Sequence, residues 1–217
     1  LRSMMDTDGD GDPPLENVDV FLPAWVELLR SVSADHPGWG REVRRLLREA
    51  VELHGGVEGL GELAHRSGAD HPEAYHDWVG ALVRLDRLPE AIRAAREGVA
   101  RIRDAAYRAR LGDRLGLLAR RVSDTDLAVE ATRAAWRASP TQVRLLQLVN
   151  AAETASVRET VLAREASMIL RPDWQHSDAL ACRLLLLVGR HEEAATRFQR
   201  ADALGWGRSD HAGSVVL

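Results

Sequence analysis

The sequence predicts an all-α fold, and three observations support this prediction. Apolar residues recur at helical spacing in almost every segment after residue 17. Period-two alternation over five or more residues, which is typical of a half-buried strand, is absent. Aromatic residues make up only 5% of the chain, and its apolar content is mainly Ala and Leu, which favour helices. We therefore expect about eleven helices and no strand.

The composition indicates a folded protein without a global attraction for nucleic acid or membranes. The 217 residues are 45% hydrophobic and 29% charged, which suits one or two domains with a core of their own. The net charge is -4, whereas nucleic acid and anionic membranes attract basic surfaces. The longest apolar stretch, Leu184 to Val188, is too short to span a bilayer. The first residues lack a charged leader followed by an apolar segment, so we expect no export.

The use of Arg and Cys predicts the source and the compartment. All 29 basic residues are Arg, which we interpret as GC-rich codon usage, and we expect a bacterial source. Cys182 is the single cysteine and lies in an apolar helical run, so neither an intrachain disulfide nor a thiolate metal site can form. A reducing cytoplasm fits this pattern. The chain opens on Leu1 and closes on apolar Leu217, so we expect a fragment of a longer protein.

The first helices follow an acidic leader, residues 1–17, which contains Gly and Pro. Residues 18–66 show three helical patterns. In one of them Val43 and Leu47 mark an apolar face, while Arg44 and Arg48 belong to the opposite face, which we expect to be solvated. This segment is either a cap at the end of a helical stack or a degenerate repeat pair, and we prefer the cap.

Capping residues and glycines mark the ends of the helices. Asp70 with Glu73, and Ser156 with Glu159, have the spacing of a capping box, in which a side-chain oxygen precedes a carboxylate by three residues. These pairs predict helix starts near residues 71 and 157. Glycine can adopt the left-handed conformation that ends a helix. The helix stops are expected at Gly55-Gly56, Gly68, Gly189 and Gly205.

Two distant segments share one pattern of small residues. Leu88-Pro89-Glu90-Ala91 is followed by Ala95, and Gly189-Arg190-His191-Glu192-Glu193-Ala194 is followed by Phe198. The equivalent points are Ala91, Ala128, Thr160 and Ala194, in steps of 37, 32 and 34 residues. This spacing and pattern resemble the second helix of the tetratricopeptide-repeat (TPR) unit, which has a period of about 34 residues. The resemblance covers about four degenerate units over residues 72–203.

The resemblance implies antiparallel helical hairpins stacked as a right-handed solenoid. The repeat region would extend over residues 67–204, followed by a C-terminal tail, residues 205–217, in which Trp206 packs on the last repeat. A non-repetitive helical bundle is the alternative. In both cases the core consists of helices packed on helices.

The acidic leader contains half of a calcium-binding pattern. Asp6, Asp8 and Asp10 have the spacing of the first three EF-hand ligands, and Gly11 occupies the glycine position. The second half departs from the pattern, because prolines follow and Asn17 stands where a bidentate Glu is required. An acidic linker is therefore the preferred interpretation, and these residues are a weak calcium candidate.

Searches for catalytic and metal-binding patterns give no candidate. The eight histidines form no HExxH motif, no GxSxG elbow occurs, and the glycines around residue 55 lack both the order of GxGxxG and a preceding strand. We therefore expect no enzyme activity, no cofactor and no resident metal.

The repeat register predicts a partner-binding surface lined by arginine. In TPR proteins the first helix of each pair lines a concave groove, and a basic groove could hold an acidic peptide. The candidate residues are Arg84, Arg110, Arg120, Arg121 and Arg183. We expect a non-catalytic protein-interaction scaffold with a protein or peptide partner. The alternatives are a calcium-responsive segment, a nucleic-acid-associated regulator, and a solvated helix face without a partner.

Overall fold

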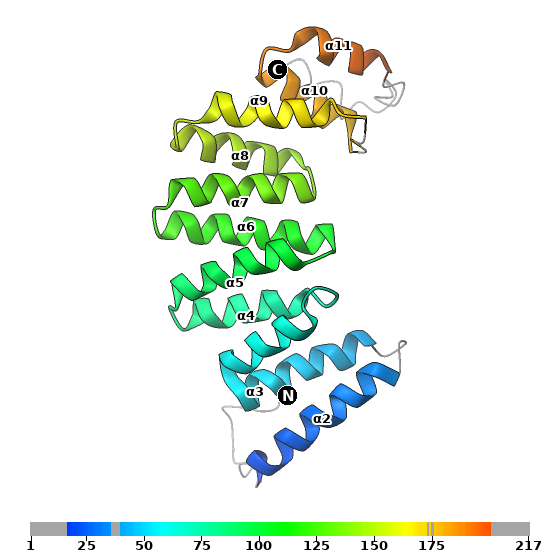
Figure 1. The fold of residues 1–217 in the computed structure, drawn as a ribbon, viewed down its shortest axis with the longest axis vertical. Helices are drawn as coiled ribbons and strands as arrows, with labels where there is room; N and C mark the ends of the chain where they lie inside the picture. Colours follow the sequence, from blue (N-terminus) through cyan, green and yellow to red (C-terminus); the bar gives the residue numbers. More distant parts are fainter. Residues whose placement is uncertain (1–16, 36–39, 173, 175, 201–217) are drawn as a thin grey trace, which may run out of the picture. The chain divides into compact units, whose positions relative to one another are not determined.

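The structure is a computed structural model that describes residues 17–35, 40–172, 174 and 176–200. These residues form ten α-helices, shown in Figure 1, and no strand occurs among them. The all-α class is therefore confirmed. The helices are α2 (Val18–Asp35), α3 (Gly40–Ser67), α4 (Glu73–Arg84), α5 (Leu88–Arg101), α6 (Ala105–Arg121), α7 (Thr125–Ala138), α8 (Gln142–Thr154), α9 (Arg158–Ile169), α10 (Asp178–Leu187) and α11 (His191–Arg200).

The chain divides into two compact units, unit 1 (Leu1–Leu111) and unit 2 (Gly112–Leu217). Unit 1 contains α2 to α5, unit 2 contains α7 to α11, and α6 begins in the first unit and ends in the second. No helix in the described part of the chain has the length and apolar character needed to cross a membrane. The leader with Asp6, Asp8 and Asp10, and the predicted stop at Gly205, lie outside the described residues.

Unit 1 is built from helices that each pack on the next in the chain. α2 packs on α3, α3 on α4, and α4 on α5. Leu22, Val26 and Leu29 recur at helical spacing on α2 and are buried. Burial of such a side chain contributes roughly 2 kcal/mol, so this face holds α2 in place.

A kink divides α3 at the predicted glycine stop. Gly56 has a φ of 60° and a ψ of -148°, a backbone conformation that side chains other than glycine rarely adopt. Helical structure resumes after it, and Val57, Leu60 and Leu63 of the second segment are buried. The kink therefore turns the second half of α3, which carries part of the site described below.

Close packing between α4 and α5 depends on a glycine and a tyrosine. Tyr75 of α4 is fully buried. A Cβ on Gly98 of α5 would lie 2.4 Å from Leu111 and 2.9 Å from the Tyr75 ring, so only glycine fits there. The Tyr75 hydroxyl donates a 2.7 Å hydrogen bond to Glu97 of the same helix as Gly98. α4 and α5 are thus joined by an apolar contact and a polar one.

The core of unit 2 lies between α7, α8, α9 and α10. Trp136 is 1% exposed and belongs to this core. Cys182 is also buried, with its thiol 3.5 Å from the carbonyl oxygen of Ala194, and burial raises the pKa of the thiol. Its burial agrees with its position in an apolar helical run of the sequence. The other large core residues are Leu145, Leu148, Leu162, Ile169, Leu184 and Leu185.

Four helix-to-helix turns have the same backbone geometry. Each contains one residue of positive φ: Asp86 (55°), Ser123 (56°), Ser156 (58°) and Gly189 (75°). In each turn the N–H of the following residue bonds to the carbonyl oxygen five residues before it, at 2.8 to 2.9 Å. The N–H of the positive-φ residue itself bonds three residues back. This pair of bonds is the Schellman motif, which satisfies the last carbonyls of a helix.

The turns recur at intervals of 37, 33 and 33 residues. The next helix begins in the same way after each turn, with backbone N–H groups of Ala91, Ala128, Val161 and Ala194 bonding four residues back. For the third turn, the sequence pattern predicted Thr160 at this equivalent position. The structure places Val161 there, and its side chain is buried while Thr160 is exposed.

The predicted capping boxes were wrong, although helices begin close to the expected places. α4 begins after Pro72 and α9 after Val157, and neither position has a side-chain cap. Ser156 instead supplies the positive-φ residue of its turn. Side-chain caps occur at Asp124 and Thr141, whose oxygens accept from the N–H groups of Leu127 and Arg144.

Candidate functional site

The two predicted arginines of unit 1 each contact a neighbouring side chain. Arg84 ends α4 and forms an ion pair with Glu52 of α3. Arg110 of α6 lies with its guanidinium carbon 4.1 Å from the centre of the Tyr107 ring, one turn earlier. Both arginines are exposed. Each therefore has a local partner within unit 1.

The three predicted arginines of unit 2 have different surroundings. Arg120 lines a cavity of about 270 Å³ between the turn after α6 and the end of α8. Arg121 is the last residue of α6 and is exposed. Arg183 of α10 is half-buried, and its Nε is shielded from solvent without a hydrogen-bond partner among the residues that the structure describes. Arg120 is thus the one among these three that lines a described cavity.

The charged residues of the described part form no metal site. Within residues 17–35, 40–172, 174 and 176–200, no group of three or more His, Cys, Asp and Glu side chains is arranged to hold a metal ion. The calcium candidate Asp6, Asp8 and Asp10 lies outside these residues and stays a prediction.

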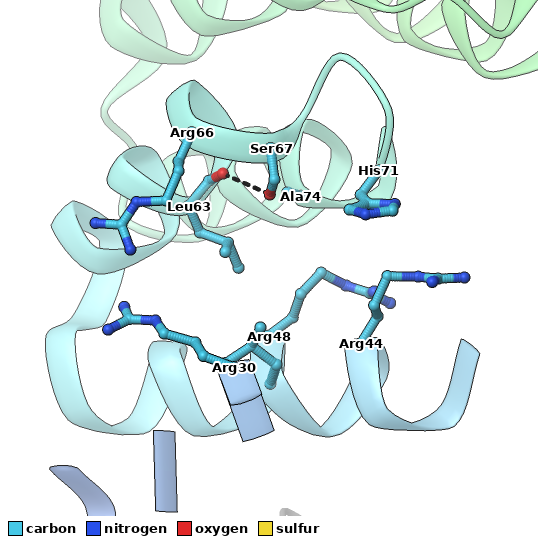
Figure 2. Close-up of a pocket in the computed structure, with 9 residues that line it drawn as sticks. Arg30, Arg44, Arg48, Leu63, Arg66, Ser67, His71 and Ala74 are labelled. Atoms are coloured by element: carbon cyan, nitrogen blue, oxygen red, sulfur yellow. Dashed lines mark hydrogen bonds between the residues drawn. The ribbon is translucent and has the colours of Figure 1, made fainter. Parts of the chain in front are cut away.

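A different set of arginines surrounds a cavity of about 390 Å³ in unit 1, shown in Figure 2. We call it the arginine pocket. In the view of Figure 2, side chains of the last turn of α3 and the start of α4 form one wall, and side chains of α2 and the first half of α3 form the other. The lining residues are Arg30, Arg44, Leu47, Arg48, Leu63, Arg66, Ser67, His71 and Ala74.

Helical spacing and the kink of α3 place these residues together. Arg44 and Arg48 are four residues apart, so they lie on the same face of α3, with Leu47 beside them. Arg66 comes from the segment after the Gly56 kink. The expectation of a solvated face was wrong for Arg48, whose side chain is only 17% exposed, and Arg44 is half-buried.

The charges around the pocket are unequally balanced. Arg48 donates to Asp77 at 2.5 Å, and Arg30 forms an ion pair with Glu27 on its own helix. Among the described residues, Arg44 and Arg66 are not within ion-pair distance of any carboxylate, and no Asp or Glu lines the pocket. Two guanidinium groups therefore carry positive charge that no described side chain neutralises at close range.

The positive charge acts on Glu73 at the start of α4. Burial by itself would raise the pKa of Glu73, but its own backbone N–H and the Tyr107 hydroxyl bond to the carboxylate, and the charges of Arg48 and Arg44 favour the ionised form. The net result is a pKa below the ordinary value. A carboxylate near the pocket is thus held in its charged form.

One arginine of the pocket has an unsatisfied donor. The Nε of Arg30 is shielded from solvent and has no hydrogen-bond acceptor among the described residues. Such buried donors are uncommon in folded proteins and call for a partner. The Ser67 hydroxyl, in contrast, donates a 3.0 Å hydrogen bond to the carbonyl oxygen of Leu63.

The arginine pocket was not predicted from the sequence, because its residues are distant along the chain. Arg30 and Arg66 are separated by the whole of the first α3 segment, and only the packing of α2 on α3 brings the pocket together. The signal available in the sequence was the pair Arg44 and Arg48, which flanks the apolar Leu47.

Comparisons of the chain with protein-family models, curated proteins and solved structures find no match.

Proposed function

We propose that this chain is a non-catalytic helical-repeat module that binds a protein partner. The observation that carries the proposal is the fourfold recurrence of one helix-to-helix turn, centred on Asp86, Ser123, Ser156 and Gly189. A period of about 34 residues with two helices per repeat is typical of TPR-like arrays. Such arrays offer an extended surface for a bound polypeptide.

The helix pairs fit the proposed arrangement. α4 with α5, α8 with α9, and α10 with α11 pack together within their units, and each of these pairs is joined by one of the recurring turns. A single pair cannot bury its apolar face alone, so each needs a neighbouring pair. We propose that the pairs continue this packing as a right-handed solenoid, capped at its beginning by α2 and α3.

The residues of the arginine pocket favour binding over catalysis. Guanidinium groups stay protonated and act only as donors, so they hold anions but transfer no protons. The four arginines that line the pocket would therefore attract a carboxylate-rich or otherwise anionic segment of a partner.

Selection from a displayed peptide library tests the proposal. The purified chain is compared with a double variant, Arg44→Gln with Arg66→Gln, and with a control double variant, Arg45→Gln with Arg93→Gln. The control removes the same charge from exposed positions that do not line the pocket. Circular dichroism checks that each variant is folded.

The expected result is enrichment of acidic peptides by the wild-type chain and by the control, with loss of that enrichment in the pocket variant. Binding constants of the selected peptides, measured by calorimetry, then give the size of the effect. Absence of any enriched sequence in all three selections would count against an interaction module. Enrichment of nucleic acid in a parallel selection, with an affinity that falls steeply with salt, would favour the alternative regulator.

A further inference from the structure

We infer that the arginine pocket binds a phosphate monoester dianion on an apolar stem. This inference rests on the proposed function only for the source of the phosphate, which would be a phosphorylated side chain of the partner. A free phosphorylated small molecule has the same chemistry, and the experiment below distinguishes the two sources. The charge, the cavity lining and the hydrogen-bond donors that support it all belong to unit 1.

The charge of the pocket matches a dianion. Four arginines line it, and the ion pairs of Arg30 and Arg48 with Glu27 and Asp77 account for two of the positive charges. Arg44 and Arg66 supply two more without a carboxylate within ion-pair distance among the described residues, although the charge of Arg44 helps to lower the pKa of Glu73. A phosphate monoester carries close to two negative charges at neutral pH, whereas a single carboxylate carries one.

The donors suit the oxygens of phosphate. A guanidinium group presents its N–H donors in a planar fork that matches phosphate geometry. Figure 2 shows these forks on both walls: Arg66 lies on one wall with His71, and Arg30, Arg44 and Arg48 lie on the other. A phosphate with three acceptor oxygens can take donors from several directions at once.

The apolar part of the lining indicates a stem on the anion. Leu47, Leu63 and Ala74 contribute to the walls. The cavity volume of about 390 Å³ lies within the range of volumes of small-molecule binding sites. This volume is far larger than one phosphate group needs. A phosphorylated side chain or a phosphorylated aromatic molecule would use both the arginines and this apolar surface.

In unit 2, by contrast, two arginines have a structural role. Arg133 and Arg137 of α7 both donate to Glu165 of α9, a carboxylate that is 1% exposed. There both guanidinium groups contact a carboxylate inside the fold. The arginine pocket lacks such an internal carboxylate among the described residues, and the Nε of Arg30 has no acceptor.

Calorimetric titration of the whole chain at about pH 7.5, where a monoester with a second pKa near 6 is a dianion, tests the inference. The probes are phenyl phosphate, inorganic phosphate, benzoate and benzene-1,4-dicarboxylate. Phenyl phosphate is expected to bind at least tenfold more tightly than benzoate, and more tightly than inorganic phosphate, which lacks the stem. Loss of one charge-assisted hydrogen bond typically costs about tenfold in affinity, so Arg44→Gln and Arg66→Gln should each weaken phenyl phosphate binding by about that factor.

Arg45→Gln is the matched control, because Arg45 lies on α3 next to Arg44 but does not line the pocket. It should change the affinity by less than twofold. Equal binding of phenyl phosphate and benzoate, tighter binding of the dicarboxylate, or equal losses in Arg44→Gln and Arg45→Gln would overturn the inference. Thermal unfolding of each variant shows whether it is folded. If one of the variants Arg44→Gln and Arg66→Gln does not fold, the other still tests the inference.

A capped phosphotyrosyl peptide and its unphosphorylated form distinguish the sources. Binding of the phosphopeptide at least threefold more tightly than phenyl phosphate supports a protein source, and equal binding supports a small molecule. If no phosphate probe binds while acidic peptides are selected, the inference fails and the proposed function stands. If phenyl phosphate binds but no displayed peptide is selected and the phosphopeptide binds no more tightly than phenyl phosphate, the interaction module fails and the phosphate site stands.

Discussion

Arg137 holds the buried carboxylate of Glu165 in a two-pronged contact. Its Nε lies 2.9 Å from one carboxylate oxygen and its terminal nitrogen lies 2.7 Å from the other. Arg133 adds a 2.5 Å contact from the preceding turn of α7. Glu165 is 1% exposed, so the contact joins α7 to α9 inside unit 2. A buried charge with fully matched donors is costly to break from one side.

Removal of both arginines should destabilise unit 2. Arg133→Ala with Arg137→Ala leaves Glu165 buried without a partner, and we expect a loss of about 3 kcal/mol in the free energy of unfolding. Glu165→Leu removes the buried charge itself and should cost clearly less, because the cavity is filled by an apolar side chain. Urea unfolding followed by circular dichroism measures both. Arg164→Ala, on the exposed face of α9, is the control and should change stability by less than about 0.5 kcal/mol.

The recurring turn gives a prediction with an unusual sign. Ser123 and Ser156 hold positive φ values that cost a residue with a Cβ roughly 1 kcal/mol, and glycine avoids this cost. Ser156→Gly should therefore stabilise the chain by up to about 1 kcal/mol, and Gly189→Ala should destabilise it by a similar amount. Thermal unfolding measures both changes.

A helix-interior serine supplies the control for these turns. Ser167 lies inside α9, so Ser167→Gly should lower stability by about 0.5 kcal/mol, which is the opposite sign. Destabilisation by Ser156→Gly would contradict the equivalence of this turn with the glycine turn at residue 189.

The helices could be predicted from the sequence, whereas some details of the turns between them could not. Helix formation follows from apolar spacing, which any window of the chain reveals, and the apolar run that contains Cys182 contributes buried residues to the core. The turns at Asp86, Ser123 and Ser156 were not predicted, because short polar residues adopt the left-handed conformation less often than glycine does. The one-residue error at Thr160 has the same origin, since the turn fixes where the next helix begins.

The arginine pocket could not be predicted, because it depends on packing between helices. Arg44 has the same helical position whether its face meets solvent or a neighbouring element, and the sequence alone does not say which. Arg30 and Arg66 enter the same site only after α2 packs on α3 and α3 bends at Gly56. The arginines selected from the repeat register were chosen by position along the chain, and that rule contains no information about cavities.

Stability should fall at high pH because of Tyr75. Burial, together with the hydrogen bond to Glu97 and the charge of Glu97, raises the pKa of Tyr75 to about 12 from an ordinary value of 10. The folded state thus keeps its proton at a pH where the unfolded state loses it. The contribution is complete below about pH 10 and is lost as the pH rises from 10 to 12. Thermal unfolding between these pH values should show a weaker decline for Tyr75→Phe than for the wild type. Tyr107→Phe keeps Tyr75 and should leave the decline in place.

Glu97 gives the corresponding prediction at low pH. Burial alone would raise its pKa, but hydrogen bonds from Tyr75, Arg101 and His65 outweigh burial and place the pKa below the ordinary 4.5. Its contribution to stability is therefore present above about pH 4.5 and is lost as the pH falls below that value. Glu97→Gln should be less stable than the wild type at pH 7, and the difference should shrink near pH 3. A constant difference across this range would show that the charge of Glu97 is not what matters.

Removal of the last helix pair tests the proposed repeat arrangement. In a repeat array each pair contacts mainly its neighbours, so a chain ending at Pro172, which lacks α10 and α11, should still unfold cooperatively with a reduced melting temperature. A chain ending at Leu187 keeps α10 but loses α11, which packs on it and covers Cys182. That chain exposes an apolar surface and should melt below the chain ending at Pro172. In a non-repetitive bundle the order would reverse, because loss of two helices from one shared core costs more than loss of one. Calorimetric melting of the two chains beside the wild type therefore decides between a repeat array and a bundle.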